Sequence, residues 1–178
     1  MENKKLVLDF IKPKNLVVTI IFTVFPLTWI FGLIYLLFTY LPCRIRAGKC
    51  VAALEAKGEL DKAASELANA NKETFMKGNV VLTDNYLFCK KTGVVIPCKD
   101  ILWTYKFRQT TSLLFIPLVV RDSLYVATKT MKPFAAFTMG KDKTEQVVGA
   151  IMGIYKRNNS CLVGFTNENS KSYKALRK

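Results

Sequence analysis

The stretch Asp100–Arg108 reads DILWTYKFR, and its apolar residues fall at every second position. Strict alternation is typical of a β-strand with one buried face, because successive side chains of a strand point to opposite sides. Such an aromatic stripe most often belongs to the core of a sheet. A ligand groove, with Lys106 and Arg108 beside the rings, is the alternative. The predicted face consists of Ile101, Trp103, Tyr105 and Phe107.

Further short β-prone segments lie on both sides of this stretch and are separated by turn-forming residues. Thr83-Asp84-Asn85, Lys91-Thr92-Gly93 and Arg121-Asp122-Ser123 are each predicted to be turns. About seven short antiparallel strands result. They are 79–82, 86–90, 94–98, 100–108, 113–120, 124–129 and 133–139, and 161–166 is one more extended stretch.

One helix is clearly predicted after these strands, from Asp142 to Arg157. Asp142 stands at the N-cap position with Glu145 three residues later, a variant of the capping box. Apolar residues recur at helical spacing through the segment, and Asn158-Asn159-Ser160 ends it. The predicted fold class is therefore α+β, with a C-terminal helix that closes an antiparallel β-barrel or sandwich.

The stretch from Asn15 to Pro42 contains no charged residue. Leu16–Leu41 would be roughly 39 Å long as a helix, and a bilayer core is about 30 Å thick. We therefore predict one transmembrane helix, kinked at Pro26, since the apolar run is too long for a signal peptide. A hairpin of two half-spans is disfavoured because each arm would be too short to cross.

The region between this segment and the strands is rich in helix formers. Residues 44–57 and 59–72 are predicted to be two helices, and Gly58 suits the end of the first. The sequence thus predicts a basic lead over 1–14, a transmembrane helix over 15–42, a helical connector over 43–77, a β domain over 78–166 and a basic tail over 167–178.

Charge and cysteine content bear on location and partners. The net charge is +14, and basic residues flank both ends of the apolar stretch, so they do not decide its orientation. Five cysteines without scaffold spacing favour a reducing compartment. The sequence predicts a single-pass protein of the cell membrane with its C-terminal domain in the cytoplasm.

The basic side chains suggest where an anionic partner would bind. Anionic lipid headgroups attract lysine and arginine placed beside a bilayer, and a protein partner is the other candidate. Nucleic acid is not expected, because no nucleic-acid-binding motif occurs, and self-association is left open. An ordinary solvated surface is the simpler interpretation of the same residues. The candidate binding residues are Arg44, Arg46, Lys49, Lys106, Arg108, Lys129, Lys132, Lys141 and Lys143.

Residues for covalent chemistry are scarce in this chain. It has no histidine, the commonest general base and metal ligand. The cysteines lack the spacing of a zinc site, and no phosphate-binding glycine loop or nucleophile elbow occurs. We therefore predict no catalytic residue, no metal and no cofactor, and a protein that is not an enzyme.

The order of about seven strands and one amphipathic helix over 78–157 resembles pleckstrin-homology-like domains. More specifically, 82–88, 95–105 and 164–168 resemble segments of an uncharacterised group of bacterial membrane proteins that carry such a domain. The resemblance implies a bent barrel-like sandwich, and this group supplies no activity. Eukaryotic members of the fold bind phosphoinositides through a basic β1–β2 loop. Here the matching loop, 83–85, has no lysine or arginine, so we do not expect that mode.

The sequence favours a membrane-anchored, non-catalytic scaffold that binds a protein partner, an anionic membrane surface, or both. Two alternatives come from other classes. One is a small accessory or regulatory subunit of a transport or secretion complex, and the other is a membrane-tethered nucleic-acid binder.

Overall fold

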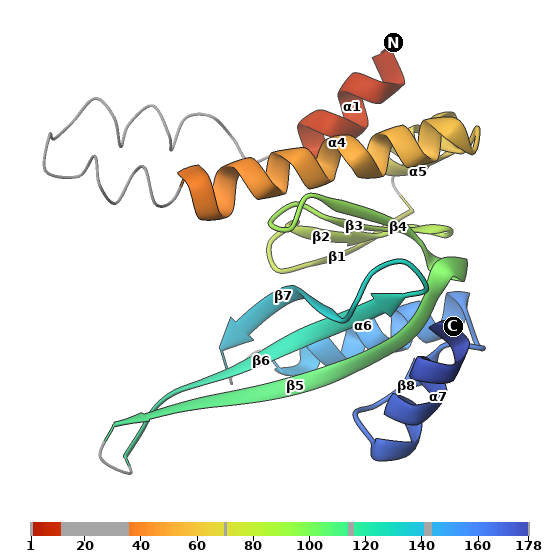
Figure 1. Cartoon of the computed structure of the whole chain (residues 1–178). Helices are drawn as coiled ribbons and strands as arrows, with labels where there is room; N and C mark the ends of the chain where they lie inside the picture. Colours follow the sequence, from red (N-terminus) through yellow and green to blue (C-terminus); the bar gives the residue numbers. More distant parts are fainter. Residues whose placement is uncertain (1, 12–35, 70, 114–115, 141–143, 178) are drawn as a thin grey trace, which may run out of the picture. The chain divides into compact units, whose positions relative to one another are not determined.

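The computed structural model describes residues 2–11, 36–69, 71–113, 116–140 and 144–177, and Figure 1 gives the labels of its helices and strands. The chain divides into two compact units. Unit 1 comprises Met1–Ala68 and Cys89–Val95, and unit 2 comprises Asn69–Phe88 and Ile96–Lys178.

The predicted transmembrane helix is not supported. Across the described ranges, no helix combines the length and the apolar character that crossing a bilayer requires. Most of the predicted 15–42 segment, up to residue 35, lies outside these ranges. At the C-terminal end of that segment, the chain forms a π-helical turn, η2 (Leu36–Tyr40), followed by α4 (Leu41–Ala56). The sequence of α4 contains charged residues, so this helix is not an apolar one. The predicted single-pass membrane location depended on that helix, so it is not supported either.

Unit 1 is built on three helices: α1 (Glu2–Ile11), α4 and α5 (Leu60–Ala68). Each buries residues spaced three or four apart, which places them on one helical face. Gly58 adopts φ +68° between α4 and α5, as its predicted place after a helix end requires. The buried residues are Val7, Ile11, Cys43, Ala47, Val51, Leu54, Leu60, Ala63, Ala64 and Leu67.

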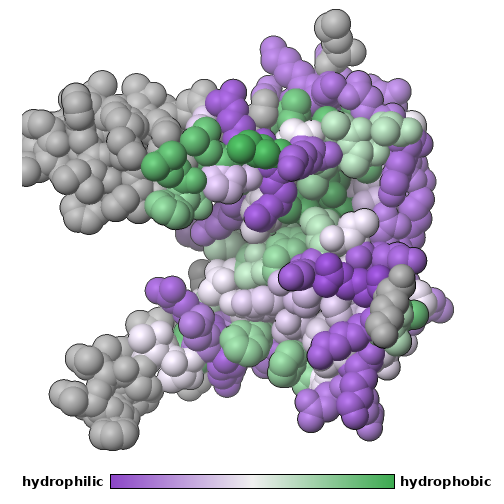
Figure 2. Space-filling view, in the orientation of Figure 1, coloured by the Kyte–Doolittle hydropathy of each residue, from purple (hydrophilic) through white to green (hydrophobic). Residues whose placement is uncertain are grey.

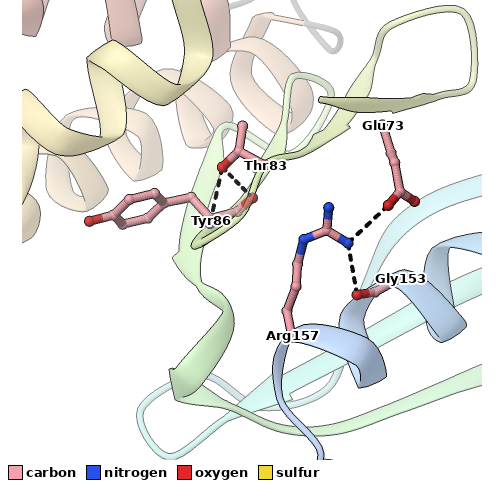
Figure 3. Close-up of polar contacts among 5 residues, drawn as sticks. All are labelled: Glu73, Thr83, Tyr86, Gly153 and Arg157. Carbon is pink, nitrogen blue, oxygen red and sulfur yellow. Dashed lines mark hydrogen bonds and ion pairs between the residues drawn. The ribbon is translucent and has the colours of Figure 1, made fainter. Parts of the chain in front are cut away.

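The first sheet has the strand order β1-β2-β3-β4. Its strands are short: β1 (Glu73–Phe75), β2 (Val80–Leu82), β3 (Tyr86–Cys89) and β4 (Val94–Pro97). The predicted turn after β2 is confirmed. Thr83 closes it, because its hydroxyl donates to the Tyr86 carbonyl and accepts from the Tyr86 N–H, each at 3.2 Å (Figure 3).

The second sheet is dominated by a long antiparallel hairpin of β5 (Ile101–Leu113) and β6 (Ile116–Thr128). The predicted turn at Arg121-Asp122-Ser123 is wrong, because these residues lie within β6. Asp122 tolerates a buried strand position because Arg108 lies directly opposite and donates two hydrogen bonds to its carboxylate, at 2.8 and 2.9 Å. The Asp122 carboxylate, a group more common in turns, is thus neutralised by Arg108 of the neighbouring strand β5.

Two strands complete this sheet, in the order β7-β6-β5-β8. They are β7 (Phe134–Gly140), antiparallel to β6, and β8 (Leu162–Val163), parallel to β5. The fold is α+β with two four-stranded sheets, and in the described part of the chain neither sheet closes. The predicted pleckstrin-homology-like barrel is therefore wrong. One reason is that β5 and β6 run on as single long strands where the sequence suggested extra turns.

Helix α6 (Thr144–Arg157) covers one face of the second sheet. It lies within the predicted 142–157 range, although Asp142, the predicted N-cap residue, is outside the described residues. At its C-terminal end, the Arg157 guanidinium donates to Glu73 of β1 and to the Gly153 carbonyl, each at 3.0 Å (Figure 3). Asn158 then donates to the carbonyls of Cys98 and Ile101, both at 2.9 Å.

The last element is α7 (Asn167–Arg177), a helix in the segment that was predicted to be a basic tail. One buried residue, Tyr173, holds this helix on the second sheet. Its hydroxyl lies 3.2 Å from the carbonyls of both Thr128 and Met131, just beyond the end of β6. The helix is thereby fixed at one end of the sheet face opposite α6.

Candidate binding site

The aromatic residues of β5 follow the predicted alternation and share one face of the second sheet. Trp103 and Tyr105 are buried, whereas Phe107, the next in the row, is 40% exposed. Tyr125 of β6 lies directly across from Tyr105, and the two rings stack with centroids 5.2 Å apart. The row therefore passes from core to surface, and the core interpretation is confirmed for Trp103 and Tyr105.

Phe165 adds a ring from outside the sheet. It stacks on Trp103 at a centroid distance of 5.9 Å and an angle of 9°, and it also contacts Tyr105 and Phe107. With 60% of its surface exposed, it is the most open ring of this group. We call the group the aromatic shelf: Trp103, Tyr105, Phe107, Tyr125 and Phe165.

The backbone before Phe165 is held in place by specific hydrogen bonds. The Trp103 indole N–H donates to the Gly164 carbonyl at 2.8 Å, and the Gly164 N–H donates to the Thr104 carbonyl at 3.0 Å. Gly164 has φ +94°, which a residue with a Cβ rarely adopts. Because this turn is fixed, Phe165 stays over the sheet despite its exposure. Figure 2 shows hydrophobic side chains at the surface over β5.

An open cavity of about 610 Å³ is lined by Trp103, by α7 and by the loop after β6. Three lining side chains, Lys132, Lys174 and Arg177, are basic, and no described residue that lines the cavity is acidic. The remaining lining is largely apolar. We call this the cationic pocket, and its lining residues are Trp103, Lys132, Pro133, Ser170, Tyr173, Lys174 and Arg177.

The loop that carries Lys132 is also well fixed. Thr128 closes the turn, since its N–H donates to the Met131 carbonyl at 3.1 Å and its hydroxyl accepts from the Met131 N–H at 3.0 Å. The Tyr173 hydroxyl binds the same turn from α7. The cations of the pocket therefore project from two anchored elements, which limits the entropy lost when an anion binds.

Two ionisable side chains of the second sheet, Tyr105 on the shelf face and Asp122 on the opposite face, have shifted pKa values. Burial, and then the neighbouring Tyr125 and Tyr173 phenols, raise the pKa of Tyr105, so this phenol stays neutral at physiological pH. The Arg108 side chain lowers the pKa of Asp122 to about 2, which keeps that carboxylate charged and paired. Neither group is suited to act as a general base near neutral pH.

The nine basic residues that the sequence suggested for binding do not belong to a single site in the structure. Lys132 lines the cationic pocket, and Lys129 is exposed on the same loop. Lys106 is exposed on β5, while Arg108 is engaged with Asp122. Lys141 and Lys143 lie outside the described residues. The other three belong to α4 in unit 1, where Lys49 is exposed and two donate hydrogen bonds: Arg44 to the Tyr40 hydroxyl and Arg46 to the Thr92 carbonyl.

Sequence reasoning missed Phe165, Tyr173, Lys174 and Arg177. One signal was present, because Ser170, Tyr173, Lys174 and Arg177 recur at spacings that place them on one face of a helix. Without knowledge of the loop that the helix faces, however, this pattern does not identify a pocket.

The cysteines do not form a reactive centre. All five are reduced, and burial raises the pKa of both Cys89 and Cys161 to about 12. These thiols are therefore protonated and poorly nucleophilic near neutral pH. In the ranges that the structure describes, no group of three or more histidine, cysteine or acidic residues is placed to hold a metal ion.

Comparison with protein-family models, with curated proteins and with solved structures gives no match to this chain. The resemblance to membrane-anchored pleckstrin-homology-like proteins therefore stays a prediction.

Proposed function

We propose that unit 2 is a non-catalytic binding module for an acidic segment of a protein partner. The observation that carries the proposal is the cationic pocket, where Lys132, Lys174 and Arg177 surround an apolar cavity without an acidic neighbour among its described lining residues. Three like charges in one cavity repel one another, and an anionic ligand relieves that repulsion.

The aromatic shelf supplies the second part of the proposed site. Trp103 belongs to both the shelf and the pocket, so the two parts of the proposed site adjoin at this residue. Interfaces between proteins are commonly anchored by aromatic residues and arginine, with a polar rim around them. The net charge of +14 would also accelerate encounters with an acidic partner.

Packing of the rings disfavours nucleic acid as the ligand. Single-stranded nucleic acids bind proteins by stacking bases on open ring faces. Here Trp103 is covered by Phe165, and Tyr105 is stacked on Tyr125, so these large faces are already occupied. A peptide side chain can pack on the exposed surface that Phe107 and Phe165 present.

Tryptophan fluorescence provides a direct test. The chain has two tryptophans, so Trp29→Phe leaves Trp103 as the sole reporter, in the wall of the pocket. Titration of this full-length variant with a short peptide containing one tyrosine among glutamates should change the Trp103 emission. We expect the triple variant Lys132→Ala, Lys174→Ala, Arg177→Ala to weaken binding by about tenfold or more.

A charge-matched control separates the pocket from the overall field of the protein. The triple variant Lys106→Ala, Lys129→Ala, Lys171→Ala removes the same charge from exposed positions outside the pocket lining. It should keep most of the affinity, and equal weakening by the two triple variants would refute a localised site. Preferential binding of oligothymidylate, or of vesicles containing anionic lipid, would refute a protein ligand.

A further inference from the structure

The two sheets have four edge strands, and they differ in how well they are protected. Three are very short: β1 has three residues, β4 has four and β8 has two. β7 has seven residues and, within the described chain, pairs with β6 alone. Shortening an edge strand is one way in which proteins avoid unwanted strand pairing, so β7 stands apart from the other three.

The sequence of β7 also lacks charge and proline protection, and its ladder with β6 has a single irregularity, between Leu124 and Tyr125. It reads FAAFTMG, without a charged residue or an internal proline. By contrast, the free stretch of β5 beyond its short pairing with β8 carries Lys106 and Arg108. Five of the seven β7 residues are at least partly exposed, so the strand is accessible. An uncharged edge of this length is the surface to which an extended segment adds as another strand.

The edge is continuous with the proposed binding surface. Ala135 of β7 lies directly across from Tyr125, which belongs to the aromatic shelf. Residues directly opposite in a ladder point to the same face of a sheet. Every second side chain of a strand added beside β7 would therefore lie along the face that carries the shelf.

Charge indicates what kind of segment would bind. Lys132 lies two residues before β7, and the sequence continues after β7 with Lys141 and Lys143. A second copy of this chain, paired antiparallel, would bring the basic end of one β7 against the basic end of the other. A segment with an uncharged β-prone centre and acidic residues at both ends has the opposite, complementary pattern.

We propose that the acidic partner segment binds unit 2 by adding as an extended strand to the free edge of β7. This inference rests on the proposed function, because it takes the same acidic protein ligand, and it adds the mode of binding. Main-chain hydrogen bonds along Phe134–Gly140 would supply affinity, and the shelf and the cationic pocket would select the side chains.

Backbone methylation of a peptide separates strand addition from simple charge attraction. The probe is a peptide of alternating valine and threonine with paired glutamates at both ends. A second version is N-methylated at alternate residues, which keeps every side chain and charge but removes the donors that a ladder needs. With the unmodified full-length chain, the first peptide should slow amide hydrogen exchange in residues 134–140, and the methylated peptide should not.

A substitution at the edge provides an independent measurement. Ala135→Glu places an acid beside the added strand and should weaken binding of the unmethylated peptide about tenfold. Gln109→Glu makes the same charge change at an exposed position of β5 and should alter affinity less than about twofold. If Ala135→Glu fails to fold, the comparison of the two peptides still decides the question.

The possible failures can be told apart. Equal binding of both peptides, with protection only in α7 and the loop after β6, would overturn strand addition and leave the proposed function standing. If self-association of this chain slowed hydrogen exchange in β7 without any peptide, strand addition by a partner would be overturned in favour of pairing between two copies of this chain. Failure of the unmethylated peptide to bind, while the tyrosine-containing peptide still binds the pocket, would also overturn strand addition.

Discussion

The two faces of the second sheet are covered to different degrees. Helix α6 closes one face, where even the charged Asp122 has no exposed surface. Helix α7 covers only one end of the other face, which leaves Phe107 and Phe165 40% and 60% exposed. Exposed rings contribute less to folding than buried ones. We therefore assign stability to the closed face, and the binding that we propose to the open face.

The polar groups follow the same division. On the closed face, Asp122 accepts from Arg108 and from the Thr144 hydroxyl at the start of α6, so its charge is used within the fold. On the open side, Lys132, Lys174 and Arg177 face a cavity that contains no described acidic side chain. The three basic side chains that line one pocket thus lie on the open side of the sheet.

Loss of the buried carboxylate should have the largest effect on folding. Asp122→Asn removes the charge that Arg108 and Thr144 bind, and should lower the free energy of unfolding by about 2–3 kcal/mol. Urea unfolding followed by circular dichroism measures it. Asp84→Asn, at an exposed turn position, is the matched control and should change stability by less than about 0.5 kcal/mol. Equal effects would contradict the closed-face interpretation.

The pH dependence of stability provides a second measurement of the same carboxylate. Arg108, followed by the Thr144 hydroxyl, holds the pKa of Asp122 at about 2, below its usual value of about 3.9. The folded state therefore binds the proton less readily than the unfolded state. The stabilisation is complete above about pH 4 and is lost as the pH falls towards about 2. Asp122→Asn should remove this part of the acid dependence, and an unchanged profile would contradict the pairing.

Two glycines of α6 should respond in opposite directions to the same substitution. A Cβ at Gly153 would lie 2.6 Å from the buried Leu82 side chain, whereas one at Gly149 would meet only Phe75, at 3.5 Å. Alanine favours a helix over glycine by about 1 kcal/mol, but overpacking costs about 1–3 kcal/mol. We expect Gly153→Ala to destabilise by about 1 kcal/mol and Gly149→Ala to stabilise by up to about that amount. Thermal unfolding of both variants tests the tight packing of α6.

Substitution of the most exposed shelf ring should separate stability from binding. Phe165→Ala should cost only about 0.5–1 kcal/mol of stability, since most of the ring is exposed. It should nevertheless weaken binding of the tyrosine-containing acidic peptide about fivefold or more. Val163→Ala, at another exposed apolar position before the same turn, is the control. A loss of stability without a loss of affinity would show that the ring serves only the fold.

The smallest effect concerns thiol reactivity and leaves folding unchanged. Burial raises the pKa of both the Cys50 and the Cys161 thiol, to about 12 for Cys161, and Cys50 is the less buried of the two. A maleimide at pH 8 should label Cys50 before Cys161 in the native protein, because the thiolate is the reactive form. Mass spectrometry of the labelled peptides measures the order. Fast native labelling of Cys161 would show that solvent reaches this part of unit 2.

Residues whose behaviour depends on near neighbours in the chain were well predicted. The alternation of Trp103, Tyr105 and Phe107 placed them on one face, and helical spacing located α6. The turn at Thr83 and the glycine after α4 followed from local backbone preferences. These patterns repeat over a few residues, so they can be recognised without the rest of the fold.

Residues whose role depends on distant partners were predicted poorly. Asp122 was interpreted as a turn residue, because its partner Arg108 is fourteen positions away and only the ladder register brings them together. Lys174 and Arg177 were assigned to a tail, since the loop they face ends about forty residues earlier in the chain.

The amino-acid sequence alone determined the strong positive charge, the absence of histidine, the aromatic alternation of β5 and the helical period of α6. These are properties of composition and of local periodicity. The tertiary structure decided that β5 and β6 form one long hairpin, that one sheet face is closed and the other open, and that three cations meet beside Trp103. The reason is physical: register, burial and charge pairing arise between segments that are distant in the chain, and no local pattern encodes them.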